Sequence, residues 1–292
     1  MKKHFITSIV LLLCIKVRAQ EQTYLYPSGA IQSKGMMSNG VMTGAWTFFY
    51  ENGKKKSLGY YKNGKIDSCW VFFDENMLIQ KTGWYKNELI DSVWTFWSPD
   101  GYKNSEGMYR NGLMEGKWTE YHPNGKIKSE GQHKAGKREG KWTFAHYDGY
   151  TEKEENYRNG KLEGKKIEYY KNGKKKSEVN YLADSLTGRW QLWYDNGRAQ
   201  TDGVMINGKE EGKWMFWDST GHQSIIGNYH TGVWHGKWTE YNAKGKKIAE
   251  GKYNMNKKTG TWHYWNEIGD IKKIEVYKKE KLYKEVNFEF SQ

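Results

Sequence analysis

The segment GKWTEYHPNGKIKSEG, residues 116–131, contains the pattern that decides the fold of this chain. Related segments recur every 24 residues along most of its length. A fixed period of this length is typical of stacked copies of one small unit, each of which needs a neighbour to bury its apolar face. The period therefore predicts a repeat protein. Its most regular mark is a Gly-x-Trp step, which begins at Gly44, Gly116, Gly140, Gly188, Gly212, Gly236 and Gly260.

Aligned on this period, residues 20–283 divide into eleven repeats, followed by a tail, residues 284–292, that we expect to form a closing strand. The repeats start at residues 20, 44, 68, 92, 116, 140, 164, 188, 212, 236 and 260. With each repeat numbered from 1 to 24, position 3 is Trp in nine copies and position 10 is Gly in all but one. Position 16 is usually Gly and position 18 is usually Tyr. These recurring residue types predict one backbone structure for every repeat.

Two turn signals separate two short β-rich runs in each repeat. Asn52-Gly53 and its equivalents mark the first turn, and Asn63-Gly64 and its equivalents mark the second. Asn-Gly is a strong hairpin signal because a type I′ turn needs positive φ at both central residues. We therefore predict an all-β fold, an elongated single-layer antiparallel meander built from eleven β-hairpin repeats. At the second turn, a four-residue loop would keep the repeats in line, whereas a two-residue loop would shear the sheet.

If positions 9 and 10 form the first turn, two residues that pair across the hairpin have repeat-position numbers that add up to 19. Trp at position 3 then faces Gly at position 16, and Tyr at position 18 faces Gly at position 1, so each ring covers a glycine. Trp142 and Trp262 are exceptions because they face Glu155 and Glu275. One face becomes an aromatic stripe of positions 3, 5 and 18, and the other carries mixed charge at positions 2 and 15. Position 6 is also aromatic, so either a bulge redirects it or both faces carry aromatic rings.

The composition and the N-terminus bound the kind of protein. The chain has 292 residues and a formal charge of +13. It begins with a secretory-signal pattern: two lysines, an apolar run from Phe5 to Ile15, and a cleavage site after Ala19. The run is too short to span a membrane, and no second hydrophobic segment follows. We predict that residues 1–19 are a signal peptide and that the mature chain is soluble and exported (periplasmic, cell-surface or secreted). Only Cys69 would remain, which excludes an intrachain disulfide.

The quoted segment resembles the bacterial variant of the MORN (membrane occupation and recognition nexus) repeat. Similar matches begin at Gly140, Gly164, Gly188, Gly212 and Gly236. The resemblance implies an extended antiparallel β ribbon that serves as a scaffold for partner proteins, with lipid binding proposed for some members. Many proteins with this variant are labelled antitoxins, which implies an antitoxin-like neutralising protein as one alternative. Export departs from that pattern, because a neutraliser of a cytoplasmic toxin should stay inside the cell.

The polar residues of the chain follow the repeat, which is not what a catalytic constellation would do. His122 and His146 share one repeat position, and Glu120, Glu168 and Glu240 share another. We interpret both sets as periodic surface residues rather than metal ligands or acid–base pairs. We therefore expect a protein that is not an enzyme and has no cofactor and no metal site. Lysines interleaved with aromatic residues can indicate nucleic-acid binding, but we do not expect it in an exported chain.

Part of the aromatic stripe is expected to remain open as a groove for a protein partner at the cell envelope. The alternative is association with an anionic glycan or lipid surface through lysines, which high salt should weaken. The predicted partner-binding residues are Trp94, Trp118, Trp142, Trp190, Trp214, Trp238, Tyr109, Tyr157 and Tyr229. The predicted basic patch, in the least regular repeat, consists of Lys161, Lys165, Lys166, Lys174, Lys175 and Lys176.

Overall fold

A computed structural model describes residues 19–289 of the chain. Within that range the chain forms 26 β-strands and no helix. The strands fall into two compact units. Unit 1 comprises the described residues up to Lys103 together with Tyr109–Leu113, and unit 2 comprises Asn104–Met108 and the described residues from Met114 onward. The predicted signal peptide, apart from Ala19, and the last three residues of the predicted tail lie outside the described residues.

The strands of both units are six to nine residues long, apart from three that contain two residues. Unit 1 contains β1 (Gln20–Leu25), β2 (Ile31–Ser38), β3 (Val41–Phe49), β4 (Lys55–Lys62), β5 (Lys65–Phe73), β6 (Ile79–Lys86) and β7 (Leu89–Trp97). Two strands, β8 (Lys103–Arg110) and β9 (Leu113–Tyr121), contribute residues to both units. Unit 2 continues with β10 (Ile127–Lys134), β11 (Lys137–Ala145), β12 (Thr151–Arg158), β13 (Lys161–Leu162), β14 (Gly164–Tyr169), β15 (Lys175–Leu182), β16 (Ser185–Leu186), β17 (Gly188–Trp193), β18 (Ala199–Ile206), β19 (Lys209–Trp217), β20 (Gln223–His230), β21 (Val233–Trp234), β22 (Gly236–Tyr241), β23 (Lys247–Asn254), β24 (Lys257–Trp265), β25 (Ile271–Lys278) and β26 (Lys281–Asn287).

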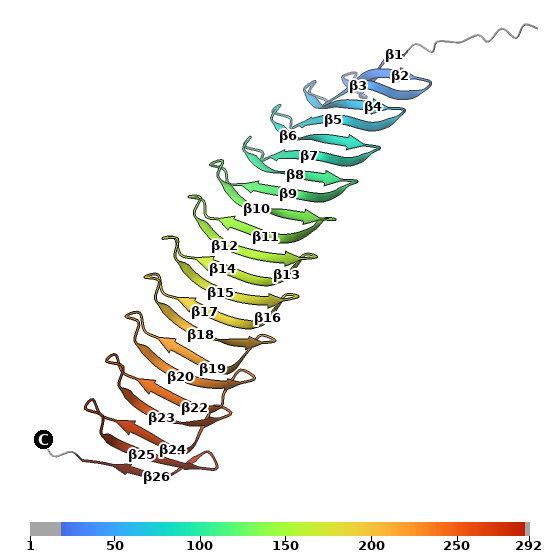
Figure 1. Ribbon diagram of the computed structural model, residues 1–292. Helices are drawn as coiled ribbons and strands as arrows, with labels where there is room; N and C mark the ends of the chain where they lie inside the picture. Colours follow the sequence, from blue (N-terminus) through green and yellow to red (C-terminus); the bar gives the residue numbers. More distant parts are fainter. Residues whose placement is uncertain (1–18, 290–292) are drawn as a thin grey trace, which may run out of the picture. The chain divides into compact units, whose positions relative to one another are not determined.

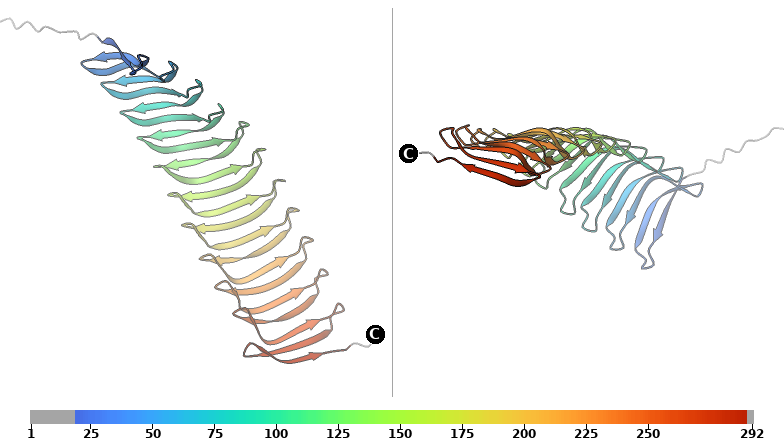
Figure 2. Two further views of the ribbon diagram at one scale, coloured as in Figure 1. Left: turned by 180° about the vertical axis from the view of Figure 1, so that it is seen from behind. Right: turned by 90° about the horizontal axis from the view of Figure 1, so that it is seen from below.

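Within each unit, the strands pair antiparallel in chain order (Figure 1). The exceptions are the short strands β13, β16 and β21, which pair only with the preceding strand, and that strand also pairs with β14, β17 or β22. The strands of each unit form a single layer, and the described residues place no second layer over either face (Figure 2). The predicted fold class, an all-β antiparallel single-layer meander, is confirmed. The last strand, β26, begins at Lys281, slightly before the predicted tail at residue 284.

The first turn differs from the predicted type I′ turn. The Gly53 N–H donates to the Tyr50 carbonyl oxygen at 2.9 Å, and the Tyr50 N–H donates to the Lys54 carbonyl oxygen at 2.8 Å. Gly53 has φ +81°, and it alone of the three loop residues has a positive φ, which fits a three-residue loop with a glycine bulge. A bulge at Lys56 then restores the predicted register in β3 and β4. Trp46 at position 3 pairs with Gly59 at position 16, as predicted from the sum of paired positions.

The second turn is the type I′ turn that the Asn-Gly signal predicted. Asn63 and Gly64 have φ values of 51° and 80° and form a two-residue loop. The shear expected from so short a loop does not accumulate, because β5 carries two extra residues, Ser68 and Cys69, opposite β4. Ser68 is position 1 of its repeat and has φ 61°, in the left-handed region where glycine is favoured. The glycine of the Gly-x-Trp step is therefore the residue that forms this bulge.

In three repeats, an asparagine at position 17 closes this bulge in a different way. Asn156 donates its Nδ2–H to the Lys165 carbonyl oxygen at 2.7 Å, while its own carbonyl oxygen accepts the Glu163 N–H at 2.8 Å. Asn180 and Asn228 make the same side-chain bond at 2.9 and 2.8 Å. These contacts interrupt the strand ladder for one residue, which separates β13 from β14, β16 from β17 and β21 from β22.

Alternation along the strands defines two faces of the sheet in each unit, the first face and the second face. The first face carries positions 3, 5, 14, 16, 18 and 23, and the second face carries positions 2, 4, 6, 12, 15 and 17. The ring of Trp193, at position 6, lies on the second face, where the Lys175 Nζ is 5.7 Å from its centroid. Both faces therefore carry aromatic rings. On the second face of unit 2, bases at position 2 pair with acids at position 15, as for Lys141 and Glu154 at 2.8 Å.

Candidate functional site

The tryptophans at position 3 form a buried row on the first face. Trp46, Trp94, Trp142 and Trp262 are each 1% exposed. Most of these indoles donate the Nε1–H to the carbonyl oxygen at position 17 of the preceding repeat, as Trp142 does to Gln132 at 3.0 Å. That carbonyl lies at the bulge, so the indole satisfies an acceptor that the strand ladder leaves open. The row is therefore structural core within a single-layer sheet.

Every ring of the row except that of Trp190 covers a glycine, but the glycine differs from the predicted one. A Cβ added to Gly59 would lie 2.2 Å from the Cδ2 of Trp70, which belongs to the next repeat, and not against Trp46 of its own hairpin. In the same way, a Cβ on Gly35 would lie 2.4 Å from the Cδ2 of Trp46. Trp46 pairs with both Gly35 and Gly59 in the ladder, and pairing arithmetic does not say toward which neighbour a ring leans.

This corrected pairing accounts for the two exceptions seen in the sequence. Trp142 faces Glu155 in its own hairpin, but its ring lies over Gly131 of the preceding repeat. Position 16 can be Glu155 rather than glycine because the next repeat has Lys166, not tryptophan, at position 3. No indole ring therefore has to lie over residue 155. Where a tryptophan stands at position 3, the preceding repeat therefore has glycine at position 16. The one departure is Trp190, which follows the buried Val179 and is itself only half-buried.

The predicted partner-binding residues divide into buried and accessible groups. Those that are buried are Trp94, Trp118, Trp142, Trp214, Trp238 and Tyr109. Those that are half-buried are Trp190, Tyr157 and Tyr229. The accessible area of the first face therefore comes from rings at positions 5 and 18 rather than from the tryptophans at position 3.

Rings at positions 5 and 18 bridge successive tryptophans on the first face. In unit 1, the centroid of Phe48 lies 6.1 Å from Trp46 and 6.0 Å from Trp70. Tyr61 lies 6.2 Å from Trp46 and 5.5 Å from Trp70, in edge contact with both. Each such pair contributes about 0.5–1.5 kcal/mol beyond its buried area. The stripe therefore stabilises the stacking of repeats while one side of each bridging ring stays accessible.

A hollow of about 520 Å³ opens in the first face of unit 1. Its lining includes the rings of Tyr24, Phe48 and Tyr61 and the small side chains of Ser33 and Ser57. Both serines occupy position 14 and are buried, so the space arises because a small residue lies between large rings. None of the predicted partner-binding residues lines this hollow. The signal that could have found it is the recurrence of Ser at position 14 on the aromatic face.

Two buried carboxylates interrupt the aromatic stripe of unit 2. Glu155 accepts hydrogen bonds from the Tyr157 hydroxyl at 2.6 Å and from the Lys153 Nζ at 2.9 Å. Burial alone would raise the pKa of Glu155, but these bonds and the nearby Lys166 outweigh it and lower that pKa. Glu275 is held similarly by tyrosines and lysines, which bring its pKa to about 2 despite its burial. Both acids therefore stay charged and act as structural anchors.

The six lysines of the predicted basic patch do not gather on one surface. Lys165 and Lys175 lie on the second face and both contact Glu178, at 2.5 and 2.6 Å. Lys166 is on the first face and pairs with Glu168 at 2.9 Å. Lys174 lies in a first-turn loop, where its Nζ donates to a backbone carbonyl oxygen. The remaining two, Lys161 and Lys176, are exposed.

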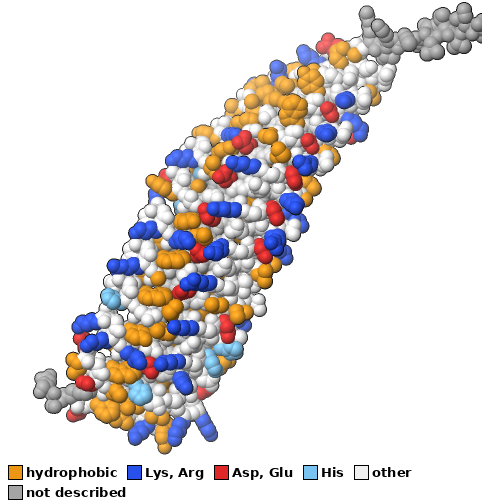
Figure 3. Space-filling model, in the orientation of Figure 1, with side chains coloured by type: hydrophobic (Ala, Val, Ile, Leu, Met, Phe, Trp, Pro, Cys, Tyr) orange, Lys and Arg blue, Asp and Glu red, His pale blue; other side chains and the backbone are white. Residues whose placement is uncertain are grey.

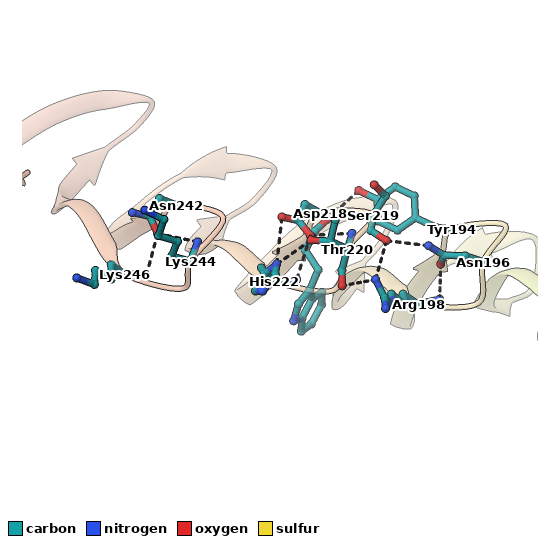
Figure 4. Close-up of polar contacts among 11 residues, drawn as sticks. Tyr194, Asn196, Arg198, Asp218, Ser219, Thr220, His222, Asn242, Lys244 and Lys246 are labelled. Atoms are coloured by element: carbon teal, nitrogen blue, oxygen red, sulfur yellow. Dashed lines mark hydrogen bonds and ion pairs between the residues drawn. The ribbon is translucent and has the colours of Figure 1, made fainter. Parts of the chain in front are cut away.

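The first-turn loops of unit 2 are joined to one another by side chains (Figure 4). Tyr194 donates its hydroxyl to the Trp217 carbonyl oxygen at 2.8 Å, and Asn196 donates its Nδ2–H to the Ser219 carbonyl oxygen at 2.7 Å. The guanidinium of Arg198 reaches carbonyl oxygens of the same following loop. His122, at the same position as Tyr194, contacts the Ala145 carbonyl oxygen through Nε2 at 2.9 Å. These contacts fix the edge of the sheet by linking each repeat to the next.

Two kinds of feature are absent from residues 19–289. No group of three or more His, Cys, Asp or Glu side chains in this range could hold a metal ion. The same range contains no helix that is long and apolar enough to cross a membrane. The fold and its two faces thus define an all-β repeat protein whose candidate site is the hollow of the first face.

Comparison with known proteins agrees with this class. The MORN repeat variant family model matches residues 42–63, 114–135 and 162–183. The starts of these segments differ by 72 and 48 residues, which are three and two periods of the repeat. The predicted resemblance to the MORN repeat variant is therefore confirmed. No curated protein matches the chain.

Solved structures give only distant likenesses. One is a crystal structure of TcdB2–TccC3–Cdc42, at 10% identity and a TM-score of 0.20, with 88% of this chain and 17% of that chain covered. Another is a Tc holotoxin pore of Photorhabdus luminescens, at 8% identity and a TM-score of 0.19, with 87% and 15% covered. The chain thus spans less than a fifth of the length of these proteins. TM-scores this low carry no argument about function.

Proposed function

We propose that this chain is an exported, non-enzymatic repeat scaffold that binds a protein partner through the first face. The observation that carries the proposal is the hollow of unit 1, where aromatic rings surround a space of about 520 Å³. Binding sites combine a mostly apolar lining with a few polar groups, and tyrosine and tryptophan dominate the strongest contacts of protein interfaces. The hollow has this character, since Gln32 and Lys56 join the rings in its lining.

The charges favour a protein partner over an anionic glycan or lipid surface. The position 2 bases of unit 2 that would attract such a surface are largely paired with acids, as are Lys117 with Glu130 at 3.0 Å and Arg189 with Asp202 at 2.8 Å. Each such pair is neutral as a whole, so position 2 adds little to the attraction of an anionic surface, and the formal charge of +13 comes from basic residues elsewhere in the chain. An apolar hollow, by contrast, keeps its affinity as the salt concentration rises.

The absence of enzymatic activity is part of the same proposal. The two buried acids, Glu155 and Glu275, are engaged by neighbouring tyrosines and lysines and are only 4% and 6% exposed. A catalytic acid or base instead needs access to a substrate. We infer that the shifted pKa values of these groups reflect packing rather than chemistry.

A blocking variant tests the proposal with a matched control. Gln32 and Gln80 are both exposed and both occupy position 13, but only Gln32 lines the hollow. Gln32→Trp should fill the hollow and Gln80→Trp should not. Proteins of the cell envelope would be captured by each variant and by the original chain at low and high salt, and quantified by mass spectrometry.

The expected result is a protein recovered by the original chain and by Gln80→Trp at both salt concentrations, and lost with Gln32→Trp. Equal recovery by both variants would show that the hollow is not the binding site. Recovery that disappears at high salt for all three proteins would instead favour an anionic ligand.

A further inference from the structure

Two buried serine hydroxyls line the hollow of unit 1 without a hydrogen-bond partner. Ser33 and Ser57 are only 5% and 6% exposed. Both line the hollow, and neither side chain makes a hydrogen bond within residues 19–289. In unit 2, Ser129 at the same position 14 donates its hydroxyl to Glu120 at position 5, at 2.8 Å. The first two repeats have aromatic rings at position 5, so their serine hydroxyls remain available to a ligand.

The hollow contains the same combination of ring and hydroxyl twice. Tyr24 pairs in the ladder with Ser33, and Phe48 pairs with Ser57. The two pairs are one repeat apart, because both rings are at position 5 and both serines are at position 14. One repeat contributes two strands about 4.8 Å apart, so the second pair lies about 9.6 Å from the first. A ligand that crosses the strands would therefore meet a ring and a hydroxyl at this interval.

We propose that the hollow binds a proline-rich segment of the partner in the polyproline II conformation, with one turn of that helix over each repeat. This inference rests on the proposed function, because it names the part of the protein partner that enters the hollow. A polyproline II helix has three residues per turn and rises about 3.1 Å per residue, so one turn advances about 9.3 Å. This advance nearly equals the spacing of the repeats. Residues i and i+3 of the segment would then lie on the rings of Tyr24 and Phe48.

The chemistry of the hollow matches that of such a segment. A polyproline II helix has no internal hydrogen bonds, so its carbonyl oxygens are free to accept hydrogen bonds from a binding site. The hydroxyls of Ser33 and Ser57 and the ammonium group of Lys56 are donors in the lining. The rings of Tyr24 and Phe48 supply the aromatic lining against which proline-rich segments dock. Because the helix is already extended before it binds, little conformational entropy is lost.

The lining of the hollow favours a proline-rich segment over a sugar chain, which could also stack on aromatic rings. The lining contains no Asp or Glu, so no carboxylate is present to accept hydrogen bonds from the many hydroxyl groups of a sugar. In unit 2, by contrast, acidic and basic side chains lie side by side over the strands on the face that Figure 3 shows. Proline has no backbone N–H and therefore brings an acceptor without a matching donor. A hollow with donors and no carboxylate suits this chemistry.

Fluorescence anisotropy of a labelled oligoproline tests the proposal. A peptide of about nine prolines spans about 28 Å as polyproline II, and a Gly/Ser-rich peptide of equal length, which is a flexible coil, is its control. We expect the original chain and Gln80→Trp to bind the oligoproline at low and high salt alike, and Gln32→Trp not to bind it. The Gly/Ser-rich peptide should not bind. Absence of oligoproline binding to the original chain would overturn the proposal.

Serine variants test the two hydroxyls. Ser33→Ala and Ser57→Ala should each raise the dissociation constant of the oligoproline by a factor of about 2 to 10, because each removes one hydrogen bond. Ser105→Ala is the matched control, since Ser105 is also buried at position 14 but does not line the hollow. It should leave the dissociation constant unchanged. Circular dichroism checks that all variants keep the β-sheet. The proposal is wrong if Ser33→Ala and Ser57→Ala both bind the oligoproline as tightly as the original chain does.

Competition experiments separate failure of this proposal from failure of the proposed function. An envelope protein that is captured through the hollow but is not displaced by excess oligoproline would overturn the polyproline II segment and leave the proposed function standing. Oligoproline binding through the hollow without any captured envelope protein would support the segment and count against an envelope partner. Binding of chitotetraose, a soluble oligosaccharide, in place of the oligoproline would overturn the proposal and assign the hollow to a sugar chain.

Discussion

Replacement of one glycine under a tryptophan tests the Gly–Trp contact that stacks the repeats. A Cβ at Gly131 would lie 2.3 Å from the Cδ2 of Trp142, whereas carbon atoms in contact are about 3.5–4.0 Å apart. The ring would have to retreat by about 1.2 Å or more to reach that range. Overpacking of this kind costs about 1–3 kcal/mol. Loss of the Nε1 bond to Gln132, which is 3.0 Å long, adds about 1 kcal/mol.

Alanine is otherwise the better residue in a strand, by about 0.5–1 kcal/mol relative to glycine. The net expectation for Gly131→Ala is therefore a loss of about 1–3 kcal/mol of unfolding free energy. In a Trp142→Leu background the ring is gone, and the same change should become neutral or slightly stabilising. The predicted sign reversal separates a specific Gly–Trp contact from a general effect of alanine.

A double-mutant cycle measured by urea unfolding gives the coupling between the two sites. Circular dichroism should follow the unfolding, and the m-value should be compared among the four proteins because repeats can unfold in part. A coupling energy of about 2–4 kcal/mol is expected, because overpacking and the lost hydrogen bond act only when the tryptophan is present, whereas the strand preference for alanine cancels in the cycle. The reasoning is refuted if Gly131→Ala costs the same amount with tryptophan and with leucine at residue 142.

Three other predictions concern a buried carboxylate, a missing Gly–Trp contact and a turn residue with positive φ. The pKa of Glu275 falls from 4.5 to about 2 on folding, so its contribution to stability is complete above about pH 5 and is lost as the pH falls toward 2; urea unfolding between these pH values should show a weaker pH dependence in Glu275→Gln. The double variant Glu155→Gly/Lys166→Trp rebuilds the Gly–Trp contact and should be more stable than either single variant in thermal unfolding. Glu155→Gly alone leaves Lys166 without this acid, and Lys166→Trp alone places a ring over Glu155 instead of a glycine. A double variant no more stable than the single variants would count against the contact. Ala135 has φ 49° in a type I′ turn, a conformation that asparagine tolerates better, so Ala135→Asn should raise the unfolding free energy by up to about 1 kcal/mol, and no gain in urea unfolding would argue against turn strain there.

The backbone of the repeat could be predicted largely from the sequence, because its signals are local. Asn63-Gly64 specifies a type I′ turn through the φ preferences of two adjacent residues, and the structure has that turn. Asn52-Gly53 carries the same letters, but only Gly53 adopts a positive φ. The three-residue loop at Asn52-Gly53 could not be told from a two-residue loop by its register, because the bulge at Lys56 restores the pairing that a two-residue loop would give. Dipeptide patterns fix the register of this hairpin more reliably than the type of its loop.

The candidate site was harder to predict because it depends on which neighbour each ring covers. The sequence places Trp46 between two glycines, and only the side-chain torsions decide that its ring lies over Gly35. That choice buries the tryptophans and moves the accessible area to positions 5 and 18. The hollow depends further on Ser33 and Ser57, whose small size matters only when the neighbouring rings are in place.

Some repeat positions serve the stacking of repeats and others form the surface, which explains how one backbone can carry two different second faces. Positions 1, 3 and 16 are committed to the bulge and to the Gly–Trp contact, and all of the buried tryptophans depend on them. Position 2 lies on the opposite face and takes no part in that contact, so Cys69 and Lys141 can occupy equivalent sites without a change in register. A change at position 2 therefore alters what a repeat presents to a partner while its stacking stays intact. For this reason the surface of each repeat must be read from positions 2, 5, 15, 17 and 18, and the Gly-x-Trp step identifies only the scaffold beneath them.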